Sequence, residues 1–292
     1  MPHQMTALRR RSWLIPATVL LVLAFGAILA PWIAPHNIRR LETLRLADSG
    51  LPPAWLAAPP AGELAPRTPF WLGTDAQGRD VLSAILFGLR VSLLVGMVGT
   101  LLALTAGTLL GLAAGYWRGW VDGAIMRLAD VQLSFPSILI ALFLMAVWGQ
   151  GLLKIILAVA IAHWVIYARV VRGAVLAERE KDYVTAIRAL GAGAPRIVLR
   201  HILPNLAAPI LVISAVEFAS VVMLEATLSF LGLGVPITRP SLGMLINFGF
   251  QDVFGGTWWT WVFPGLALVL LVLCLNWLAD ILRVRLMPEG EA

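Results

Sequence analysis

Ionisable side chains inside the long apolar runs of this sequence are costly and therefore indicate a function. Among them are His163, Glu217 and Glu225, and Asp280 lies with Asn276 toward the end of the last run. The two glutamates are eight residues apart, which places them on roughly the same face of a helix. Ser214 and Ser220 could share the depth of His163, as a serine hydrolase inside a membrane would require. Shared depth alone is weak support for an enzyme.

Other chemistries lack the residues that they need. The only lysines, Lys154 and Lys181, are not followed by Ser or Thr, as the lysine of a phosphate-binding loop is. The four histidines show no paired spacing such as His-Glu-x-x-His, and the single cysteine, Cys274, excludes a Cys-rich metal site. We therefore expect no catalytic residue, no metal and no cofactor in this chain.

The composition is that of a chain solvated by lipid. Hydrophobic residues make up 60% of the 292 residues, charged residues make up 13%, and the mean hydropathy is +0.86. One globular core cannot hide so much apolar surface. The net charge of +6 comes from basic residues scattered between apolar runs, without a stripe interleaved with aromatic residues, so membrane lipids and not nucleic acid are the expected partners.

Windows of about 20 apolar residues predict transmembrane spans. Because a span must satisfy its own backbone, and no alternating barrel pattern is present, these spans are predicted to be helices. The first run is too long for the apolar region of a signal peptide, so we expect it to be retained. The expected fold is an all-α membrane protein with six transmembrane helices, near 13–33, 91–115, 131–149, 152–173, 206–232 and 258–282.

The distribution of basic residues predicts the orientation. Most Lys and Arg of the short loops fall on one side of a six-span arrangement, which marks that side as cytoplasmic, whereas Lys154 and Arg239 fall on the other. Both termini are therefore expected in the cytoplasm. The predicted parts are a cytoplasmic terminus with the first helix (1–34), an extracytoplasmic loop (35–90), a five-helix core (91–282) that includes a cytoplasmic loop (178–204), and a cytoplasmic tail (283–292).

The extracytoplasmic loop has two parts, of which the first is rich in proline and is not expected to be regular. The second contains FWLGTDAQGRDVLSAILFGLRVS, in which Thr74 or Asp75 can cap a helix. We expect this helix to be amphipathic and to lie on the membrane before the second span, with Arg79 and Asp80 off its apolar face. A solvated linker with a frayed helix is the alternative.

The cytoplasmic loop 178–204 is long and charged enough to leave the membrane, and its sequence predicts two short helices. A helix-forming stretch ends at Gly191, and Pro195 suits the first turn of a second helix that Pro204 ends.

The first of these helices carries an apolar strip of Val184, Ile187 and Leu190, which is too short to be stable alone. Packing of a helical hairpin against its own bundle would stabilise the strip, and docking in a groove of another protein is the alternative. Gly191 has no Cβ and is free to take positive φ, so it fixes the angle between the helices and permits close approach of a partner.

The loop resembles the EAA loop of ABC importer permeases, in which a glycine and a later apolar-x-Leu-Pro sequence are separated by nine residues. Here Gly191 precedes His201-Ile202-Leu203-Pro204, and Thr185-Ala186-Ile187 stands in place of Glu-Ala-Ala. Almost the whole chain is similar to the dipeptide/oligopeptide/nickel branch of these permeases, and to its C-type subunit. The similar segments are GTDAQGRDVLS (73–83), GYWRGWVDGAIMRLAD (115–130), ARVVRG (168–173), DYVTAIRALGA (182–192), LEATLSFLGLG (224–234) and WW…FPGLA…N (258–276).

The resemblance implies a type I ABC importer permease bundle in the bacterial inner membrane, which forms half of a translocation pathway. It implies a second, homologous permease, two ABC ATPase subunits that bind ATP and magnesium, and an extracytoplasmic solute-binding protein. The expected solute is a di- or oligopeptide, with nickel complexes as an alternative. A membrane scaffold that recruits a soluble partner is the alternative from another class. A secondary transporter would show broken helices and inverted repeats, which the sequence does not indicate.

Three sets of site residues are expected, two from the resemblance and one, the translocation path, from the cost of ionisable groups inside a span. Glu225 belongs to a family-like segment and favours a structural role, whereas Glu217 matches no such segment and favours a role particular to this chain. The small residues of the second span could pack against the second permease or within the subunit. The sets are the ATPase-coupling residues Asp182, Thr185, Ala186, Ile187, Leu190, Gly191, Leu203 and Pro204, the candidate translocation path His163, Glu217 and Glu225, and the extracytoplasmic motif Gly73, Thr74, Asp75, Gly78, Arg79 and Asp80.

Overall fold

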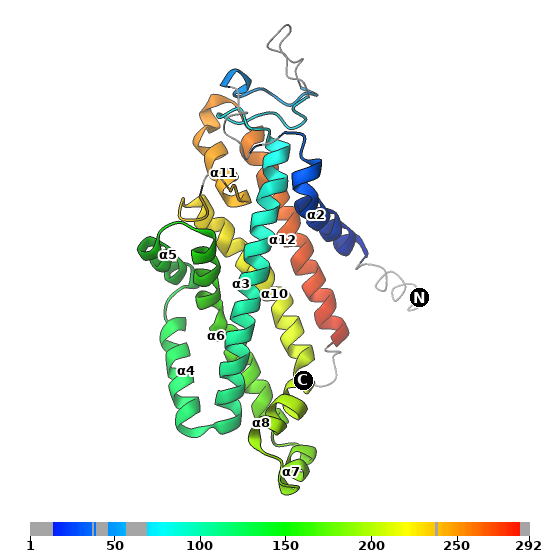
Figure 1. The fold of residues 1–292 in the computed structure, drawn as a ribbon, viewed down its shortest axis with the longest axis vertical. Coiled ribbons are helices and arrows are strands. Elements are labelled where there is room, and N and C mark those ends of the chain that lie inside the picture. The colour runs from blue at the N-terminus through cyan, green and yellow to red at the C-terminus, as the bar shows by residue number, and fades with distance from the viewer. Residues whose placement is uncertain (1–13, 37, 39–45, 57–68, 237–238, 287–292) are drawn as a thin grey trace, which may run out of the picture.

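The computed structural model describes residues 14–36, 38, 46–56, 69–236 and 239–286. These residues form an elongated bundle of helices (Figure 1). Within them, α4 (Gly119–Leu133) and α5 (Ser137–Trp148) form a sharply bent apolar pair, which is a sixth span if the pair is counted as one. The predicted all-α membrane fold is confirmed. The five further helices that are long and apolar enough to cross a membrane are α2 (Leu14–Ile33), α3 (Val81–Trp117), α6 (Leu152–Glu178), α10 (Ala207–Phe230) and α12 (Trp259–Leu286).

Short elements lie at the two ends of the bundle (Figure 1). One end carries the cytoplasmic loop, which contains α7 (Asp182–Ala189), α8 (Ala194–Ile197), the π-helical turn η3 (Val198–Ile202) and α9 (Leu203–Asn205). The other end carries η2 (Leu46–Asp48), α11 (Leu242–Gln251) and η4 (Val253–Gly255). The length of the bundle thus separates the predicted cytoplasmic loop from the predicted extracytoplasmic segment.

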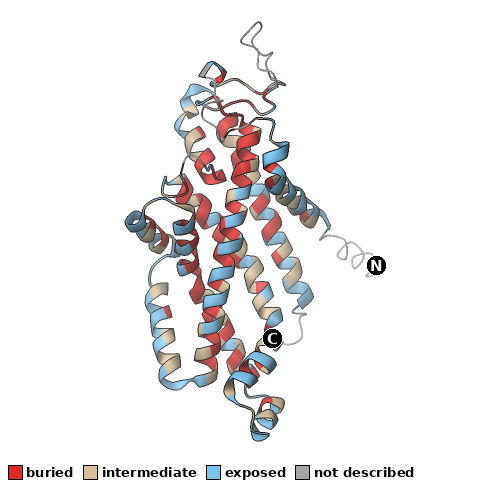
Figure 2. Cartoon of the chain, in the orientation of Figure 1, coloured by how far each residue is buried: buried red, intermediate tan, exposed pale blue. Residues whose placement is uncertain are grey.

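The core follows the contact between α3 and α6, whereas α2, α4 and α5 are mostly exposed (Figure 2). Glycines on α3 bring the two backbones together. A Cβ added at Gly99 would lie 2.6 Å from the Val159 side chain, and one at Gly111 would lie 2.6 Å from the Ala168 carbonyl oxygen. Gly96 meets Phe218 of α10 in the same way. The small residues of the second span therefore pack helices within the subunit.

The third predicted span, 131–149, is wrong as a single straight helix. Instead α4 and α5 meet at an angle of 87°. The cause is Pro136, which has no backbone N–H and keeps the residue before it out of the helical region. A proline inside an apolar run was the available signal. A broken pair of helices therefore does occur, contrary to the expectation that the sequence indicates none.

The predicted amphipathic surface helix within 35–90 is also wrong. Helix α3 begins at Val81 and runs unbroken for 37 residues, so 81–90 belong to the bundle. Its N-cap is Asp80, not Thr74 or Asp75, and the Asp80 side chain accepts a hydrogen bond from the Ser83 backbone N–H at 2.9 Å. The apolar face of this stretch packs in a core cluster with residues of α2 and α12, which removes it from the membrane surface.

Candidate functional site

The cytoplasmic hairpin of α7 to α9 is fixed to the bundle by an apolar cluster. Val184 of α7 and Ile202 of η3 are fully buried, and they pack in one cluster with Leu112 of α3 and with Val171 and Val175 of α6. The predicted hairpin packed against its own bundle is therefore correct. Burial of this apolar surface makes the hairpin a continuation of α3 and α6 rather than a loose loop.

The predicted apolar strip of α7 divides between the bundle and the surface. Val184 is buried and Ile187 is partly buried, whereas Leu190 is 87% exposed. Leu190 is the C-cap residue, where the chain leaves the helix and turns toward α8. The expectation that all three residues seek one partner is wrong, and Leu190 alone is left on the outer side of the hairpin.

A polar cluster joins the same hairpin to the ends of two long helices. Glu178, at the end of α6, accepts hydrogen bonds from the Tyr183 hydroxyl at 2.7 Å and from the Asn205 amide at 3.2 Å, and pairs with Lys181 at 2.7 Å. Burial and the hydrogen bond to Glu178 raise the pKa of Tyr183 above its ordinary value, so the phenol stays a donor. Asn205 ends α9, one residue before α10 begins, so the cluster links α6, α7 and the segment that leads into α10.

The turn after α7 is built on Gly191. Its φ is +82°, its N–H donates to the Arg188 carbonyl at 3.0 Å, and nothing lies within 4 Å of where a Cβ would be. Only a residue without Cβ adopts this conformation without strain, and the open space leaves room for a partner. Pro204 does not end the second helix as predicted, because α9 contains it and α10 follows after one residue.

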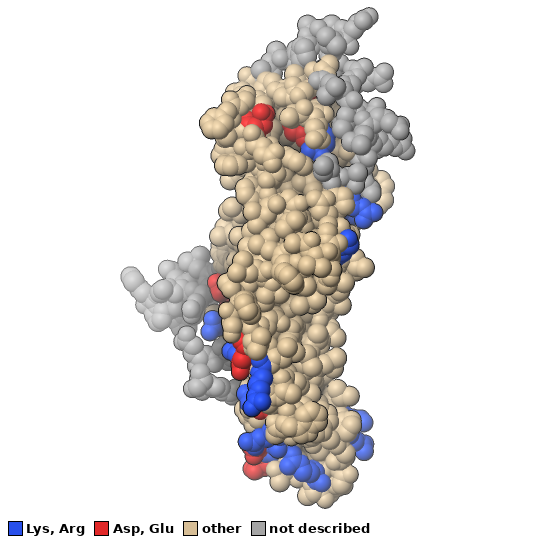
Figure 3. All heavy atoms as spheres, turned by 90° about the vertical axis from the view of Figure 1, so that its left-hand side faces the viewer, with Lys and Arg blue, Asp and Glu red and all other residues tan. Residues whose placement is uncertain are grey.

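The eight predicted coupling residues all lie on this hairpin. Six of them are exposed, and Ile187 and Leu203 are partly buried. Many of the Lys and Arg side chains on the face shown in Figure 3 gather toward this end of the molecule. The hairpin therefore presents an exposed outer surface while its inner surface is bonded to the bundle.

His163 of α6 and Glu217 of α10 meet in the interior of the bundle. His163 Nδ1 lies 2.6 Å from Glu217 Oε2, and both residues are 5% exposed. His163 also lines a cavity of about 320 Å³ together with Ser137, Ser220 and Asn276. Its Nε2 is buried and has no hydrogen-bond partner in the part of the chain that the structure describes. A charged pair thus borders a cavity with polar groups on its wall.

Glu225, two turns further along α10, is fully buried and has different partners. It accepts hydrogen bonds from the hydroxyls of Ser92 on α3 and Ser229 on α10, each at 2.7 Å. It does not line the cavity beside His163. The structure therefore brings His163 and Glu217 together and places Glu225 apart from them, in a contact between α3 and α10.

The six residues of the extracytoplasmic motif form one compact turn, 73–80, which a bridge between Thr74 and Asp80 closes. Asp75 Oδ1 accepts from the Gln77 and Arg79 backbone N–H groups, and Asp75 Oδ2 pairs with Arg79 Nε at 2.7 Å. Gly73 has a φ of +80° and would meet Trp259 at 2.7 Å if it carried a Cβ. Arg79 is 4% exposed, because the turn is packed within the outer end of the bundle.

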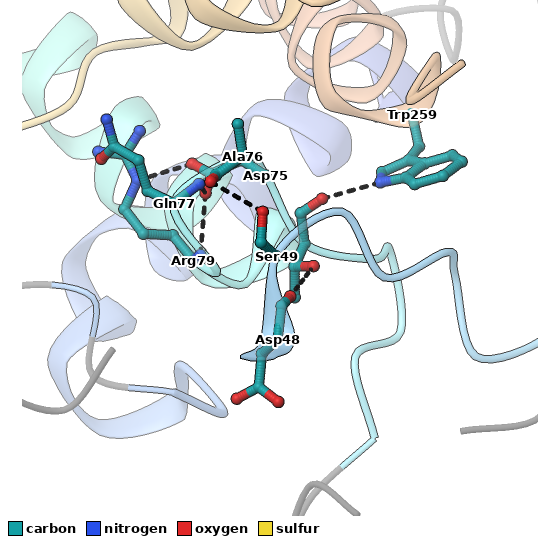
Figure 4. A network of polar contacts seen from close by, with 8 residues as sticks. Asp48, Ser49, Asp75, Ala76, Gln77, Arg79 and Trp259 are labelled. Atoms are coloured by element: carbon teal, nitrogen blue, oxygen red, sulfur yellow. Dashed lines mark hydrogen bonds and ion pairs between the residues drawn. The ribbon is translucent and has the colours of Figure 1, made fainter. Parts of the chain in front are cut away.

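The turn is bonded to parts of the chain far away in sequence (Figure 4). Thr74 Oγ1 donates to the Asp48 carbonyl at 2.5 Å, and Ser49 Oγ donates to the Ala76 carbonyl at 2.8 Å. The Trp259 indole N–H donates to the Thr74 carbonyl oxygen at 3.0 Å. The motif therefore joins η2, the start of α3 and the start of α12, which is a structural use of its residues.

Two of the family-like segments meet across α4 and α6. Arg172 forms a bidentate pair with Asp122, at 2.5 and 2.7 Å, and Arg169 pairs with Asp130 one turn away from it. Sequence reasoning did not identify these pairs, nor the Glu178 cluster. The available signal was opposite charge in two segments that flank one predicted hairpin of spans.

Comparison with known proteins gives consistent results. Residues 107–288 match the model of the family described as binding-protein-dependent transport system inner membrane component. The chain is 39% identical over 271 residues to the di/tripeptide transport system permease protein DppC of Pseudomonas aeruginosa, covering 92% of this chain and 86% of that protein. It is 41% identical over 281 residues to the dipeptide transport system permease protein DppC of Escherichia coli K12, covering 96% and 90%.

A solved structure has the same fold. A chain of the MetNI methionine ABC transporter in an inward-facing conformation superposes with a TM-score of 0.53 at 21% identity, over 68% of this chain and 93% of that one. Sequence identity, coverage and fold together identify the chain as a member of the binding-protein-dependent transport system inner membrane component family, the membrane-embedded permeases of ABC importers.

Proposed function

We propose that this chain forms half of the translocation pathway of an ATP-driven importer of di- and oligopeptides. The observation that carries the proposal is the cytoplasmic hairpin, whose inner face is packed on α3 and α6 and whose outer face is exposed around Gly191. The names of the relatives, which are peptide permeases, support the solute class.

The proposed assembly has four kinds of subunit. A second, homologous permease supplies the other half of the pathway, and an extracytoplasmic binding protein delivers the solute. Two ATPase subunits bind ATP and magnesium and dock on the hairpin through Asp182, Thr185, Ala186 and Leu190 at the exposed side of α7. Helix-in-groove docking is the recognition mode that a short exposed helix of this kind favours.

The hairpin is connected so that its movement reaches the interior. The Glu178 cluster joins it to the end of α6 and the start of α10, and these two helices carry His163 and Glu217. A rigid displacement of the hairpin by the ATPases would therefore be transmitted to both α6 and α10. ATP binding could bias two arrangements of the bundle in this way, and such a bias is what coupling requires.

The test compares Gly191→Asp with Gly119→Asp in the complete transporter, reconstituted with its ATPases, second permease and binding protein. Both glycines have positive φ, +82° and +56°, and open space at Cβ, so the backbone strain is matched. Gly119 is the first residue of α4 and lies outside the hairpin. We expect Gly191→Asp to lower ATP-driven peptide uptake and co-purification of the ATPases by roughly a hundredfold or more, a loss of about 3 kcal/mol.

Normal uptake by the Gly191→Asp protein would contradict the docking assignment. Equal losses in both variants would trace the effect to turn strain and not to a partner. If the chain were a scaffold, the unmodified complex would bind ATPases yet show no substrate-stimulated ATP hydrolysis and no peptide uptake.

A further inference from the structure

We propose that the His163–Glu217 pair and the cavity beside it bind the protonated amino terminus of a peptide during its passage. This inference rests on the proposed function and names the chemistry of one contact within it. Glu217 lies outside the family-like segments, and only the structure shows its contact with His163.

The first step is that the site is preformed. His163 is fixed by its 2.6 Å contact with Glu217, so its ring cannot rotate without losing that contact. The second ring nitrogen, Nε2, is buried and unpartnered within the described residues, although a buried polar atom without a partner is costly. His163 belongs to the wall of the cavity, so an occupant there lies beside the pair, while Nε2 itself has no exposed surface.

The second step concerns charge. Among the residues that the structure describes, the cavity wall contains neither Lys nor Arg, and its polar members besides His163 are the neutral Ser137, Ser220 and Asn276. With an ionised Glu217 and a neutral imidazole, the pair carries one negative charge, which in a medium of low dielectric constant attracts a cation and repels an anion. With an imidazolium, the pair is neutral and has no excess of positive charge.

Basic residues elsewhere on α6 do not alter this balance. Arg169 and Arg172 are each paired with a carboxylate of α4, and the Lys154 ammonium donates to the Trp148 carbonyl. They lie six, nine and nine residues from His163 along the helix, which corresponds to roughly 9 to 14 Å.

The third step is the choice of cation. An ammonium group has three donors, and the Asn276 amide oxygen and the Ser137 and Ser220 hydroxyls of the cavity wall can accept them. Met223, Leu224 and Val272 complete the wall and suit the aliphatic part of a peptide. A divalent metal ion would need several carboxylate or imidazole ligands, and no group of three such side chains occurs among the described residues. The amino terminus of a free peptide is protonated at pH 7, because its pKa is about 8.

The experiment measures charge selectivity inside the cavity. Ser220→Cys is introduced into a Cys274→Ala background, and the full complex in proteoliposomes reacts with methanethiosulfonates that carry an aminoethyl, a sulfonatoethyl or a methyl group. Thr227→Cys is the matched control. Thr227 lies seven residues further along the same face of α10, its hydroxyl bonds the carbonyl four residues back as that of Ser220 does, and it does not line the cavity.

We expect the aminoethyl-to-sulfonatoethyl rate ratio at position 220 to exceed that at position 227 by roughly tenfold. Glu217→Gln, whose amide oxygen still accepts from His163, should abolish the excess, whereas Glu217→Asp should retain it. Equal ratios at the two positions, no reaction at position 220, or an excess that survives Glu217→Gln would overturn the proposal. If the Glu217→Gln protein does not assemble, the comparison of positions 220 and 227 in the protein that keeps Glu217 still tests the proposal. Labelling does not require transport, so a complex that fails to take up peptides would refute the proposed function without affecting this result.

Discussion

Glu217 and Glu225 occupy the same helix, about two turns apart, and both are buried, yet their surroundings differ. Glu225 accepts hydrogen bonds on both oxygens from Ser92 and Ser229, and it borders no cavity that contains His163. Glu217 contacts one partner, His163, and that partner lines the cavity. The Glu225 carboxylate is hydrogen-bonded by side chains of its own subunit, whereas the Glu217 carboxylate contacts a histidine that borders a cavity.

The difference teaches that burial of a charge does not by itself define a functional site. A buried carboxylate whose oxygens are both satisfied by hydroxyls stabilises the contact between two helices. A buried carboxylate whose partner lines a cavity is suited to act on a ligand there. The comparison therefore separates stability from transport, and each role can be tested alone.

The largest expected effect is on stability, from Glu225→Ala. The substitution leaves a void and two buried hydroxyls without acceptors, so we expect the free energy of unfolding to fall by about 3 kcal/mol. Titration of the detergent-solubilised protein with SDS measures this free energy of unfolding. Glu225→Gln keeps the size and one acceptor and should lose about 1 kcal/mol. A Glu225→Ala protein that is as stable as the original would remove the structural half of the comparison.

The next effect is on transport, from Glu217→Gln. The amide oxygen still accepts from His163 Nδ1 and the volume is unchanged, so we expect unfolding to change by less than about 1 kcal/mol. The charge is lost, and peptide uptake by the reconstituted complex should fall roughly tenfold, or about 1.4 kcal/mol. A Glu217→Gln protein that lost stability but kept normal uptake would show that Glu217 has a structural role and not a role in transport.

The fold could largely be predicted from the sequence, because lipid selects long apolar helices wherever they occur. The spans at α2, α6, α10 and α12 follow from hydropathy alone, and Gly191 marks its turn by its lack of Cβ. The break at Pro136 was missed because apolar composition on both sides of it outweighed one residue. The predicted surface helix was wrong because an apolar stripe packs equally well on lipid and on other helices. Which of the two it contacts depends on how the other helices of the bundle are arranged.

The partners within the candidate site could not be predicted, because they depend on helix packing. Ser92 and Glu225 are 133 residues apart, and His163 and Glu217 are 54 apart. Which of the two glutamates would meet the histidine depends on the rotation of α6 against α10, and the apolar pattern fixes that rotation only coarsely. Two residues with similar sequence surroundings therefore received their roles from contacts that the sequence does not display.

The smallest expected effects come from the serines beside the two carboxylates. Ser92 donates its hydroxyl across helices to Glu225, so Ser92→Ala removes a buried hydrogen bond and should cost about 1.5 kcal/mol of unfolding free energy. The Ser220 hydroxyl bonds a carbonyl of its own helix at 3.3 Å, which is already bonded within that helix, so Ser220→Ala should cost less than about 0.5 kcal/mol. Uptake should respond in the opposite order, since only Ser220 lines the cavity beside His163. SDS titration and uptake on the same two proteins check both rankings, and identical rankings in the two assays would mean that one continuous polar network, and not two separate sites, runs along α10.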